Sequence, residues 1–267
     1  MDTSPTSLLR SYTPRVAIVT GSSQGIGYDI ALRLADDGID IVVNDIPSKA
    51  AKASEVVAQI QKKGRRAIFV SADVSSETDV IAMIEKAVQE LGSVDIMVAN
   101  AGIGPLRGFL ETSVEQFNTI MAINTRGVFL CYKHAALQMI KQGRGGRLIG
   151  ATSSAGKQGT KNLSAYSASK FAVRGLTQSA SIELRKYGIT ANAYAPGIIN
   201  SPLSLTPDFK GAQENGSASI KDLLGMPKET SAADADVVAS IVSYLAKPEA
   251  YFINGQSISV DGGLRYD

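Results

Sequence analysis

Short apolar runs alternate with longer amphipathic stretches along nearly the whole of this chain. The short runs are typical of strands buried on both faces, and the longer stretches repeat their apolar residues every three to four positions, as helices do. The predicted strands are 16–19, 39–43, 67–70, 94–98, 148–151, 189–194 and 257–260. The predicted helices are 26–37, 49–62, 77–91, 113–122, 126–141, 165–186 and 234–246. This alternation predicts an α/β fold with a doubly wound sheet of seven parallel strands and helices on both faces, because right-handed crossovers place helices there.

The same pattern predicts a single domain over residues 15–267, since no linker or repeat interrupts the predicted elements. A chain of this length can bury a substantial core in one α/β unit. Residues 1–14 are rich in Ser, Thr and Pro and are expected to form a flexible N-terminal arm. At residues 200–232 the strand rhythm lapses and Pro, Gly, Ser and Asn accumulate. Loops of that length in compact domains usually bind ligands, so this stretch is a predicted substrate flap.

Composition argues against several classes of partner and site. The 27 Lys and Arg against 25 Asp and Glu leave a net charge of +2 with no basic block, so no nucleic-acid partner is expected. One cysteine, Cys131, and one histidine, His134, cannot supply an intramolecular disulfide or a metal site of His and Cys ligands, so no metal is expected. No window approaches the roughly 20 apolar residues that cross a bilayer, and the first twenty residues lack the apolar run of a signal peptide. We therefore expect a cytoplasmic protein with no membrane partner.

A glycine-rich segment, TGSSQGIG, lies between the first predicted strand and the first predicted helix. Its glycines permit a tight turn, a close approach of the backbone to a diphosphate, and close packing of helix on strand. The helix that follows offers free N–H groups and the positive end of its dipole. In this context the segment predicts a Rossmann-type dinucleotide site. Its predicted cofactor-binding residues are Gly21, Ser23, Gln24, Gly25 and Gly27.

Asp45 closes the second predicted strand, 18 residues after Gly27. A carboxylate at this place can accept hydrogen bonds from both hydroxyls of an adenosine ribose, and it would repel a 2′-phosphate. Neither Gln24 nor Asn44 supplies the cation that a 2′-phosphate requires. The sequence therefore favours NAD over NADP. The alternative interpretation is that Asp45 is a solvated residue at a strand end.

Tyr166 and Lys170 lie four residues apart in the predicted helix 165–186, so their side chains share one helix face, about 6 Å apart at Cβ. An ammonium beside a phenol favours the phenolate, which predicts a lowered pKa for Tyr166 and suits it to general acid–base catalysis. Ser153 follows the strand 148–151. We expect it in the same crevice, because open α/β sheets bind ligands at the carboxyl ends of their strands.

In this combination and order the motifs resemble the short-chain dehydrogenase/reductase family over residues 15–264. The residues that carry the resemblance are TGSSQGIG, Asp73-Val74, Ala99-Asn100-Ala101-Gly102, Asn124, Ser153, Tyr166 with Lys170, and Pro196-Gly197. The resemblance implies a catalytic tetrad of Asn124, Ser153, Tyr166 and Lys170. It implies further cofactor contacts at Ile26, Asp73, Val74, Asn100, Tyr166, Lys170, Pro196, Gly197, Ile199 and Ser201.

The stretches YSASKFAVRGLTQ and GITANAYAPGIINSP are similar to those of acetoin reductases, also called butanediol dehydrogenases. The resemblance implies hydride transfer between NAD(H) and a secondary alcohol or ketone, such as a hydroxyketone, a vicinal diol or a terpenoid alcohol. It implies that Tyr166 is the general acid/base, that Ser153 binds the substrate oxygen, that Lys170 holds the nicotinamide ribose, and that Asn124 anchors a water. Where the family usually has Thr after Pro-Gly, this chain has Ser201, which keeps a hydroxyl for the carboxamide.

Two other functions stay open at this stage. An NADP-dependent ketone or 3-oxoacyl reductase would be favoured by Arg or Lys at Gln24 or at residues 44–46, where the chain has none. A non-catalytic nicotinamide-binding regulatory protein would lack members of the tetrad, whereas all four are present.

The remaining expectations concern the substrate pocket and the assembly. Apolar pocket walls are predicted from the flap and from the segment after the fourth strand, namely Leu203, Leu205, Phe209, Pro105, Leu106 and Phe109. Asn162 precedes Tyr166 in a loop that is either a plain polar loop or a substrate-facing one. His134 and Cys131 are expected to be structural. A homotetramer is expected, with helices 126–141 and 165–186 contributing interface surface.

Overall fold

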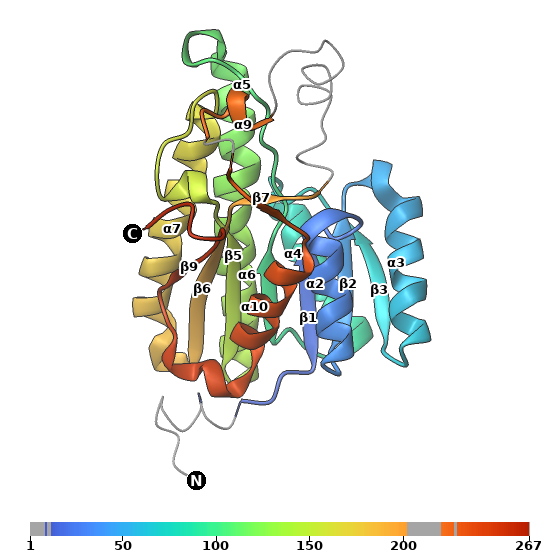
Figure 1. The fold of residues 1–267 in the computed structure, drawn as a ribbon. Coiled ribbons are helices and arrows are strands. Elements are labelled where there is room, and N and C mark those ends of the chain that lie inside the picture. Colours follow the sequence, from blue (N-terminus) through green and yellow to red (C-terminus); the bar gives the residue numbers. More distant parts are fainter. Residues whose placement is uncertain (1–8, 10–11, 202–219, 227–228, 267) are drawn as a thin grey trace.

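The computed structural model describes residues 9, 12–201, 220–226 and 229–266, which form a central parallel sheet between two layers of helices (Figure 1). The sheet order is β3-β2-β1-β4-β5-β6-β9, and every neighbouring pair is parallel. The strands are β1 Val16–Thr20, β2 Asp40–Asp45, β3 Ala67–Ser71, β4 Ile96–Ala99, β5 Gly146–Ala151, β6 Ile189–Pro196 and β9 Ser257–Val260. The predicted doubly wound sheet of seven strands is therefore confirmed.

The helices cover both faces of this sheet, as Figure 1 shows. They are α2 Gly25–Asp36, α3 Ala50–Lys62, α4 Glu77–Leu91, α5 Val114–Met121, α6 Gly127–Gln142, α7 Ser164–Leu184, α9 Ile220–Leu223 and α10 Asp236–Ala246. Short 3₁₀ turns occur at 47–49, 109–111, 154–156, 185–187 and 248–252. Helices α2, α3 and α10 pack on one face, and α4, α6 and α7 pack on the other.

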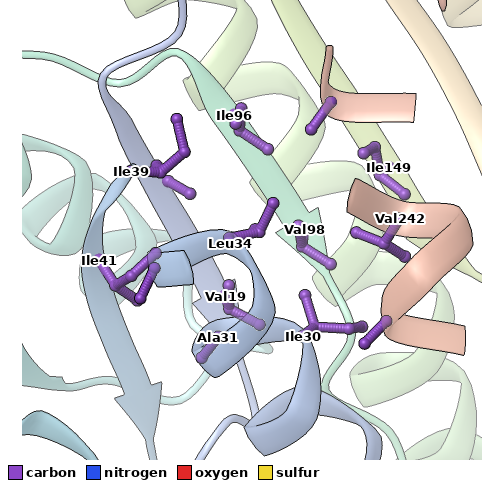
Figure 2. Close-up of a cluster of buried hydrophobic side chains, with 14 of the residues drawn as sticks. Val19, Ile30, Ala31, Leu34, Ile39, Ile41, Ile96, Val98, Ile149 and Val242 are labelled. Atoms are coloured by element: carbon purple, nitrogen blue, oxygen red, sulfur yellow. The ribbon is translucent and has the colours of Figure 1, made fainter. Parts of the chain in front are cut away.

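The core between α2 and the sheet follows from the spacing of apolar residues in the sequence. Ile30 and Leu34, one helical turn apart, lie against Val19 and Val98 of the strands (Figure 2). All four side chains are buried. Burying an aliphatic side chain of this size stabilises a fold by about 1.5–3 kcal/mol. The carboxyl end of β1 and the amino end of α2, which carry the glycine turn, therefore rest on a rigid base.

The chain between α5 and α6 differs from the sequence prediction of two separate helices. Residues Ala122–Arg126 form one π-helical turn that joins α5 to α6 without a break. Asn124 lies in this turn and is fully buried. Single π turns inside α-helices are rare and frequently occur at functional sites.

The order of the strands creates a crevice at their carboxyl ends. After β1 the chain moves to β2 and β3 on one side, whereas β4 pairs with β1 on the other. The helices that follow β1 and β4 therefore leave toward opposite faces, and ligands of doubly wound proteins bind where this happens. The glycine turn, Asn100 and Ser153 follow β1, β4 and β5 and lie along this edge.

Two segments that were predicted to be irregular contain ordered contacts. Leu9 and Tyr12, in the predicted arm, are buried, and the Tyr12 hydroxyl donates to the Asp95 carbonyl oxygen at 2.8 Å. The guanidinium of Arg147 lies 3.9 Å from the centre of the Tyr12 ring. At the two ends of the predicted flap, β7 (Ile198–Ile199), just before it, pairs with β8 (Ala232–Ala233), where it closes. The flap residues Leu203, Leu205 and Phe209 lie outside the described residues.

Within the described part of the chain, no helix is long and apolar enough to cross a membrane.

Candidate active site

A cavity of about 590 Å³ runs along the carboxyl edge of the sheet, from β2 past β1 and β4 to β5 and β6. It brings together nearly all of the residues that the sequence singled out. Those that line it are Gly21, Gln24, Gly25, Ile26, Gly27, Asp45, Asp73, Val74, Asn100, Ser153, Tyr166, Lys170, Pro196, Gly197, Ile199 and Ser201. Ser23 and Asn124 are not in the lining and act on it through their neighbours, as their hydrogen bonds show.

The glycine turn has the geometry that a diphosphate requires. Gly21 and Gly25 have φ of +63° and +59°, a conformation that residues with a side chain rarely adopt. A Cβ on Gly27 would lie 2.5 Å from the Gly21 carbonyl oxygen, so the helix could not approach the turn with any other residue there. Gln24, the residue before α2, makes no side-chain cap, so the first N–H groups of α2 keep no partner from it. The turn therefore fits an anionic group at the helix amino end.

The side chain of Asn100 stabilises the glycine turn through hydrogen bonds. Its side-chain nitrogen donates to the carbonyl oxygens of Thr20, at 2.8 Å, and Gly21, at 3.2 Å. Its side-chain oxygen accepts from the hydroxyl of Tyr194 on β6 at 2.8 Å. Although Asn100 lines the cavity, its amide thus has protein partners on every side. Sequence reasoning missed Tyr194, because nothing in the order of residues places it near Asn100.

Asp45 points toward the glycine turn. One carboxylate oxygen accepts from the backbone N–H of Ser23 at 3.3 Å and from the Ser23 hydroxyl, and the other accepts from the N–H of Ile46 at 2.9 Å. These bonds orient the carboxylate at the border of the cavity, where Ile46 and Gln24 are its neighbours. Each carboxylate oxygen can accept more than one hydrogen bond, so Asp45 retains acceptor capacity toward the cavity.

Asp73 and Val74, which follow β3, also line the cavity. One Asp73 carboxylate oxygen accepts from the backbone N–H and the hydroxyl of Ser75, both at 2.8 Å. This turn after β3 keeps the rest of Asp73 at the cavity. The group fits the polar edge of a nucleotide base.

At the other end of the cavity, Ser153, Tyr166 and Lys170 form one cluster. The Ser153 hydroxyl oxygen accepts from the Ala155 N–H at 3.1 Å, and its side chain hydrogen-bonds Tyr166. Lys170, one helical turn after Tyr166 in α7, has its ammonium nitrogen 5.4 Å from the centre of the tyrosine ring. That nitrogen donates to the Ala151 carbonyl oxygen at 2.9 Å.

Burial dominates the electrostatics of this cluster. Desolvation raises the pKa of Tyr166 above its ordinary value, and the hydrogen bond from Ser153 opposes this rise. Desolvation lowers the pKa of Lys170 to about 8. The sequence-based expectation that Lys170 would lower the pKa of Tyr166 is therefore wrong in its net direction for the protein alone. The reason is that both groups leave water together, and the ammonium donates to a backbone carbonyl instead of the phenol.

Asn124 acts on the site through the backbone of Ile103. Its side-chain oxygen accepts from the Ile103 N–H at 2.9 Å, and its nitrogen donates to the Ile103 carbonyl oxygen at 2.8 Å. The same nitrogen donates to Ser169 Oγ at 3.1 Å. The amide thus ties the loop after β4 to helix α7, and this loop forms the wall beside Tyr166.

The walls around Tyr166 differ from those that the sequence predicted. Phe109 is 79% exposed, and Leu106 packs beneath the cavity against Leu163, Leu224 and Met226. The residues that line this end are mostly apolar: Ile103, Gly104, Leu163, Ile198, Leu224 and Met226, with Ser154 and Thr160. The prediction of Phe109 as a wall is wrong, because its 3₁₀ turn carries it past the cavity into solvent.

Asn162 connects three segments around this end. It has φ of +60°, its carbonyl oxygen accepts from the Arg107 N–H, and its side chain donates to the Leu223 carbonyl oxygen at 3.1 Å. It does not line the main cavity, so its contacts fit a loop that supports the walls.

Cys131 and His134 lie away from this cavity, as predicted. Burial raises the pKa of the Cys131 thiol to about 12, which leaves it protonated. His134 Nε2 lies 2.8 Å from a Glu77 carboxylate oxygen, in a surface contact between α6 and α4.

Comparisons with known proteins agree with the fold. Residues 15–207 match the family model described as short chain dehydrogenase. The chain is 48% identical over 253 residues to the short-chain dehydrogenase/reductase eriH of Hericium erinaceus, covering 93% of this chain and 96% of that protein. It is 38% identical over 265 residues to the L-2,3-butanediol dehydrogenase of Corynebacterium glutamicum, covering 95% and 99%.

Among solved structures, the acetoin dehydrogenase YohF from Salmonella typhimurium is 34% identical, with a TM-score of 0.80 over 94% of this chain and 96% of that one. The extent of the family match, the identity of the relatives and the shared fold lead to one conclusion. This chain belongs to the short-chain dehydrogenase family and is an oxidoreductase that uses a nicotinamide cofactor.

Proposed function

We propose that this enzyme transfers a hydride between NAD(H) and a neutral secondary alcohol or ketone, with Tyr166 as the proton-transfer group. The observation that carries this proposal is the single cavity that joins the glycine turn and Asp45 at one end to Ser153, Tyr166 and Lys170 at the other. A dinucleotide that lies along the cavity would present its reactive ring beside Tyr166. The bound nicotinamide supplies the hydride acceptor in oxidation and the hydride donor in reduction.

In oxidation, the Tyr166 phenolate takes the proton of the substrate hydroxyl, and the hydride leaves the carbon that bears this hydroxyl. Ser153 holds the substrate oxygen: its own oxygen accepts from the Ala155 N–H, so its hydroxyl hydrogen, which is directed to Tyr166 in the protein alone, is the group that would donate to a substrate oxygen bound beside Tyr166. As the alcohol becomes a carbonyl, that donor stabilises the charge on the oxygen. Reduction runs through the same contacts, with the Tyr166 hydroxyl returning the proton.

Lys170 and Asn124 support this chemistry by binding the cofactor and by positioning the loop beside Tyr166. The ammonium of Lys170 lies close to the Tyr166 ring and in the cavity lining, where it can also bind the hydroxyls of the nicotinamide ribose. The Asn124 amide has all its partners in Ile103 and Ser169. We therefore propose that the side chain of Asn124 positions the loop beside Tyr166, and that a water at this place would bind to backbone groups.

The walls support a neutral substrate. Among the described residues that line the Tyr166 end, Lys170 is the only cation, and it is buried against Ala151. The other lining side chains there are apolar or carry a hydroxyl. A carboxylate or phosphate on the substrate would find no second cation among them, whereas a hydroxyketone, a vicinal diol or a terpenoid alcohol would be accommodated. The relatives named for butanediol and acetoin act on molecules of the first two kinds by their names.

The competing function is an NADP-dependent ketone or 3-oxoacyl reductase. The orientation of Asp45 toward the glycine turn favours NAD instead, because a 2′-phosphate would meet its carboxylate. The direct test compares initial rates of oxidation for acetoin, 2,3-butanediol stereoisomers and a cyclic terpenoid alcohol with NAD and with NADP, beside a 3-hydroxyacyl thioester. The proposal expects turnover of neutral alcohols with NAD. Turnover restricted to the thioester with NADP would overturn it.

We also propose a homotetramer. Helices α6 and α7 expose large apolar side chains, namely Phe129, Leu137, Phe171 and Ile182. Symmetric contact between copies of the chain would bury them. Sedimentation of the purified protein at micromolar concentration tests this, and a monomer would contradict it.

A further inference from the structure

Tyr194 connects two parts of the cavity that are far apart in the sequence. It lies in β6, two residues before Pro196, and both residues line the cavity. Its hydroxyl donates to the side-chain oxygen of Asn100, which follows β4. In the sheet, β5 lies between β4 and β6, so the tyrosine side chain crosses one whole strand to reach its partner.

The sheet makes room for this crossing. The residue of β5 in register with Tyr194 is Ala151, whose small side chain leaves the face of the strand open. Tyr194 is buried and belongs to the core cluster that also contains α2 and α10. The hydrogen bond to Asn100 is partly buried, beneath the glycine turn at the edge of the cavity, where competition from solvent is reduced.

The partners of Asn100 define the orientation of its amide. The nitrogen must face Thr20 and Gly21, because two carbonyl oxygens there need a donor. The oxygen must then face Tyr194, whose hydroxyl is a donor: burial raises the pKa of Tyr194 well above its ordinary value and keeps the proton in place. Removal of the tyrosine hydroxyl would take away the protein partner of the Asn100 oxygen and would allow the amide to rotate.

We propose that Tyr194 is a positioning residue for the cofactor: through Asn100 it holds the Thr20 and Gly21 carbonyls inward, so that the N–H groups of the glycine turn face the diphosphate. The inference rests on the proposed cofactor site and goes beyond it, because Tyr194 donates its hydrogen bond to Asn100 and acts on the cofactor through that contact. Without the hydrogen bond from Tyr194 to Asn100, the glycine turn must become ordered when the cofactor binds. The free-energy cost of that ordering weakens the affinity for the cofactor.

The test is direct binding of NADH to the full-length Tyr194→Phe protein, which keeps the ring and removes only the hydroxyl. The loss of the hydrogen bond from Tyr194 to Asn100 should raise the Kd for NADH about tenfold. The kcat at saturating cofactor should stay within about threefold of wild type. A fall of thermal stability alone would not discriminate, because any buried hydroxyl contributes to folding.

Tyr132→Phe is the matched control. Tyr132 is a second buried tyrosine, whose hydroxyl lies 3.2 Å from Thr177 Oγ1 and donates to the Asn192 carbonyl oxygen, in the core on the other face of the sheet. Its loss should lower the Tm by a similar amount and leave the Kd for NADH unchanged. Equal loss of affinity in both variants would overturn the inference, because it would reflect general loosening.

A second variant covers the case in which Tyr194→Phe does not fold. Asn100→Asp keeps Tyr194 and its partner oxygen, but removes the donor to Thr20 and Gly21, so it should weaken NADH binding at least as much. Wild-type affinity in either folded variant would overturn the inference. If wild-type protein itself does not bind NADH, the proposed function fails as well. Binding by wild type with no change in Tyr194→Phe defeats only the role given to Tyr194.

Discussion

The ammonium nitrogen of Lys170 lies 5.4 Å from the centre of the Tyr166 ring and donates to the carbonyl oxygen of Ala151. Both side chains are on one face of α7, where Lys170 is buried and Tyr166 is partly buried at the edge of the cavity. Burial disfavours the charged form of each group, so it raises the pKa of the tyrosine and lowers that of the lysine. The charged ammonium of Lys170 therefore lowers the free energy of unfolding, although the proposed mechanism requires this residue.

Lys170→Met should stabilise the folded protein while it abolishes useful turnover. The pKa of Lys170 falls from 10.5 to about 8 on folding, a difference of about 3 kcal/mol for the charged form. The loss of the hydrogen bond to Ala151 offsets about 1 kcal/mol of this, so the net gain should be about 1–2 kcal/mol at pH 7. Denaturant unfolding measures it.

The pH dependence of this stability difference follows from proton binding to Lys170 in the folded and unfolded states. The unfolded lysine keeps its proton up to about pH 10.5, whereas the folded one loses it above about pH 8. The penalty is therefore full below pH 8, and the advantage of Lys170→Met should vanish as the pH rises toward 10.5. Lys52→Met, an exposed lysine of α3, serves as control and should change stability by no more than about 0.5 kcal/mol. A Lys170→Met protein less stable than wild type at pH 7 would refute this account.

Oxidation of the alcohol should accelerate as the pH rises, and Ser153→Ala should move that rise to higher pH. The phenolate of Tyr166 is the proposed base, and the hydrogen bond from Ser153 lowers the pKa of Tyr166 against the effect of burial. Without this hydrogen bond, the effect of burial is unopposed, so the pKa of Tyr166 should rise further. The rate of the chemical step, isolated with a substrate deuterated at the reacting carbon, gives the profile. A Ser153→Ala midpoint at or below that of wild type would count against the role of the bond.

Gly104→Ala should lower kcat about 10- to 100-fold with little effect on NADH binding, because small displacements of a catalytic group are costly. A Cβ at this position would lie 3.1 Å from two ring carbons of Tyr166 and would displace the ring from its present place. Gly159→Ala is the control in the neighbouring loop, since a Cβ there meets nothing within 4 Å. Steady-state kinetics of the two proteins compares them. Equal kcat values would show that the ring has room to move.

Asp45 should give a preference for NAD of about 10- to 100-fold in kcat/KM, as expected from charge-assisted hydrogen bonds to two ribose hydroxyls. Asp45→Ser combined with Ile46→Arg should shift the ratio toward NADP, because it removes the repelling carboxylate and adds a cation beside it. Asp45→Asn keeps an acceptor and should lower the preference by less. A wild-type enzyme that favours NADP, or a ratio that these substitutions leave unchanged, would make Asp45 only a strand-end carboxylate.

The strands and the catalytic spacing were predictable because they depend on local pattern. Runs such as Val16–Thr20 are buried along their whole length, and Tyr166 and Lys170 share a helix face by their separation alone. The contact between Tyr194 and Asn100 was not predictable, because it depends on the order of β4, β5 and β6 in the sheet.

Other errors had similar physical causes. The burial of Tyr12 depends on its contact with Asp95 and Arg147, which are distant in sequence. The outward direction of Phe109 depends on a short 3₁₀ turn that carries no pattern of its own. The direction of the shift in the pKa of Tyr166 depends on how much water the fold excludes, and spacing along a helix says nothing about that.

The most direct measurement is the single-turnover rate of hydride transfer in the Tyr166→Phe enzyme, with NADH binding measured on the same sample. Phenylalanine keeps the ring that packs beside Gly104 and removes the only group proposed to exchange a proton with the substrate. The account predicts a rate at least about 100-fold below wild type, with the Kd for NADH within about threefold. A folded Tyr166→Phe protein that transfers hydride at nearly the wild-type rate would contradict it.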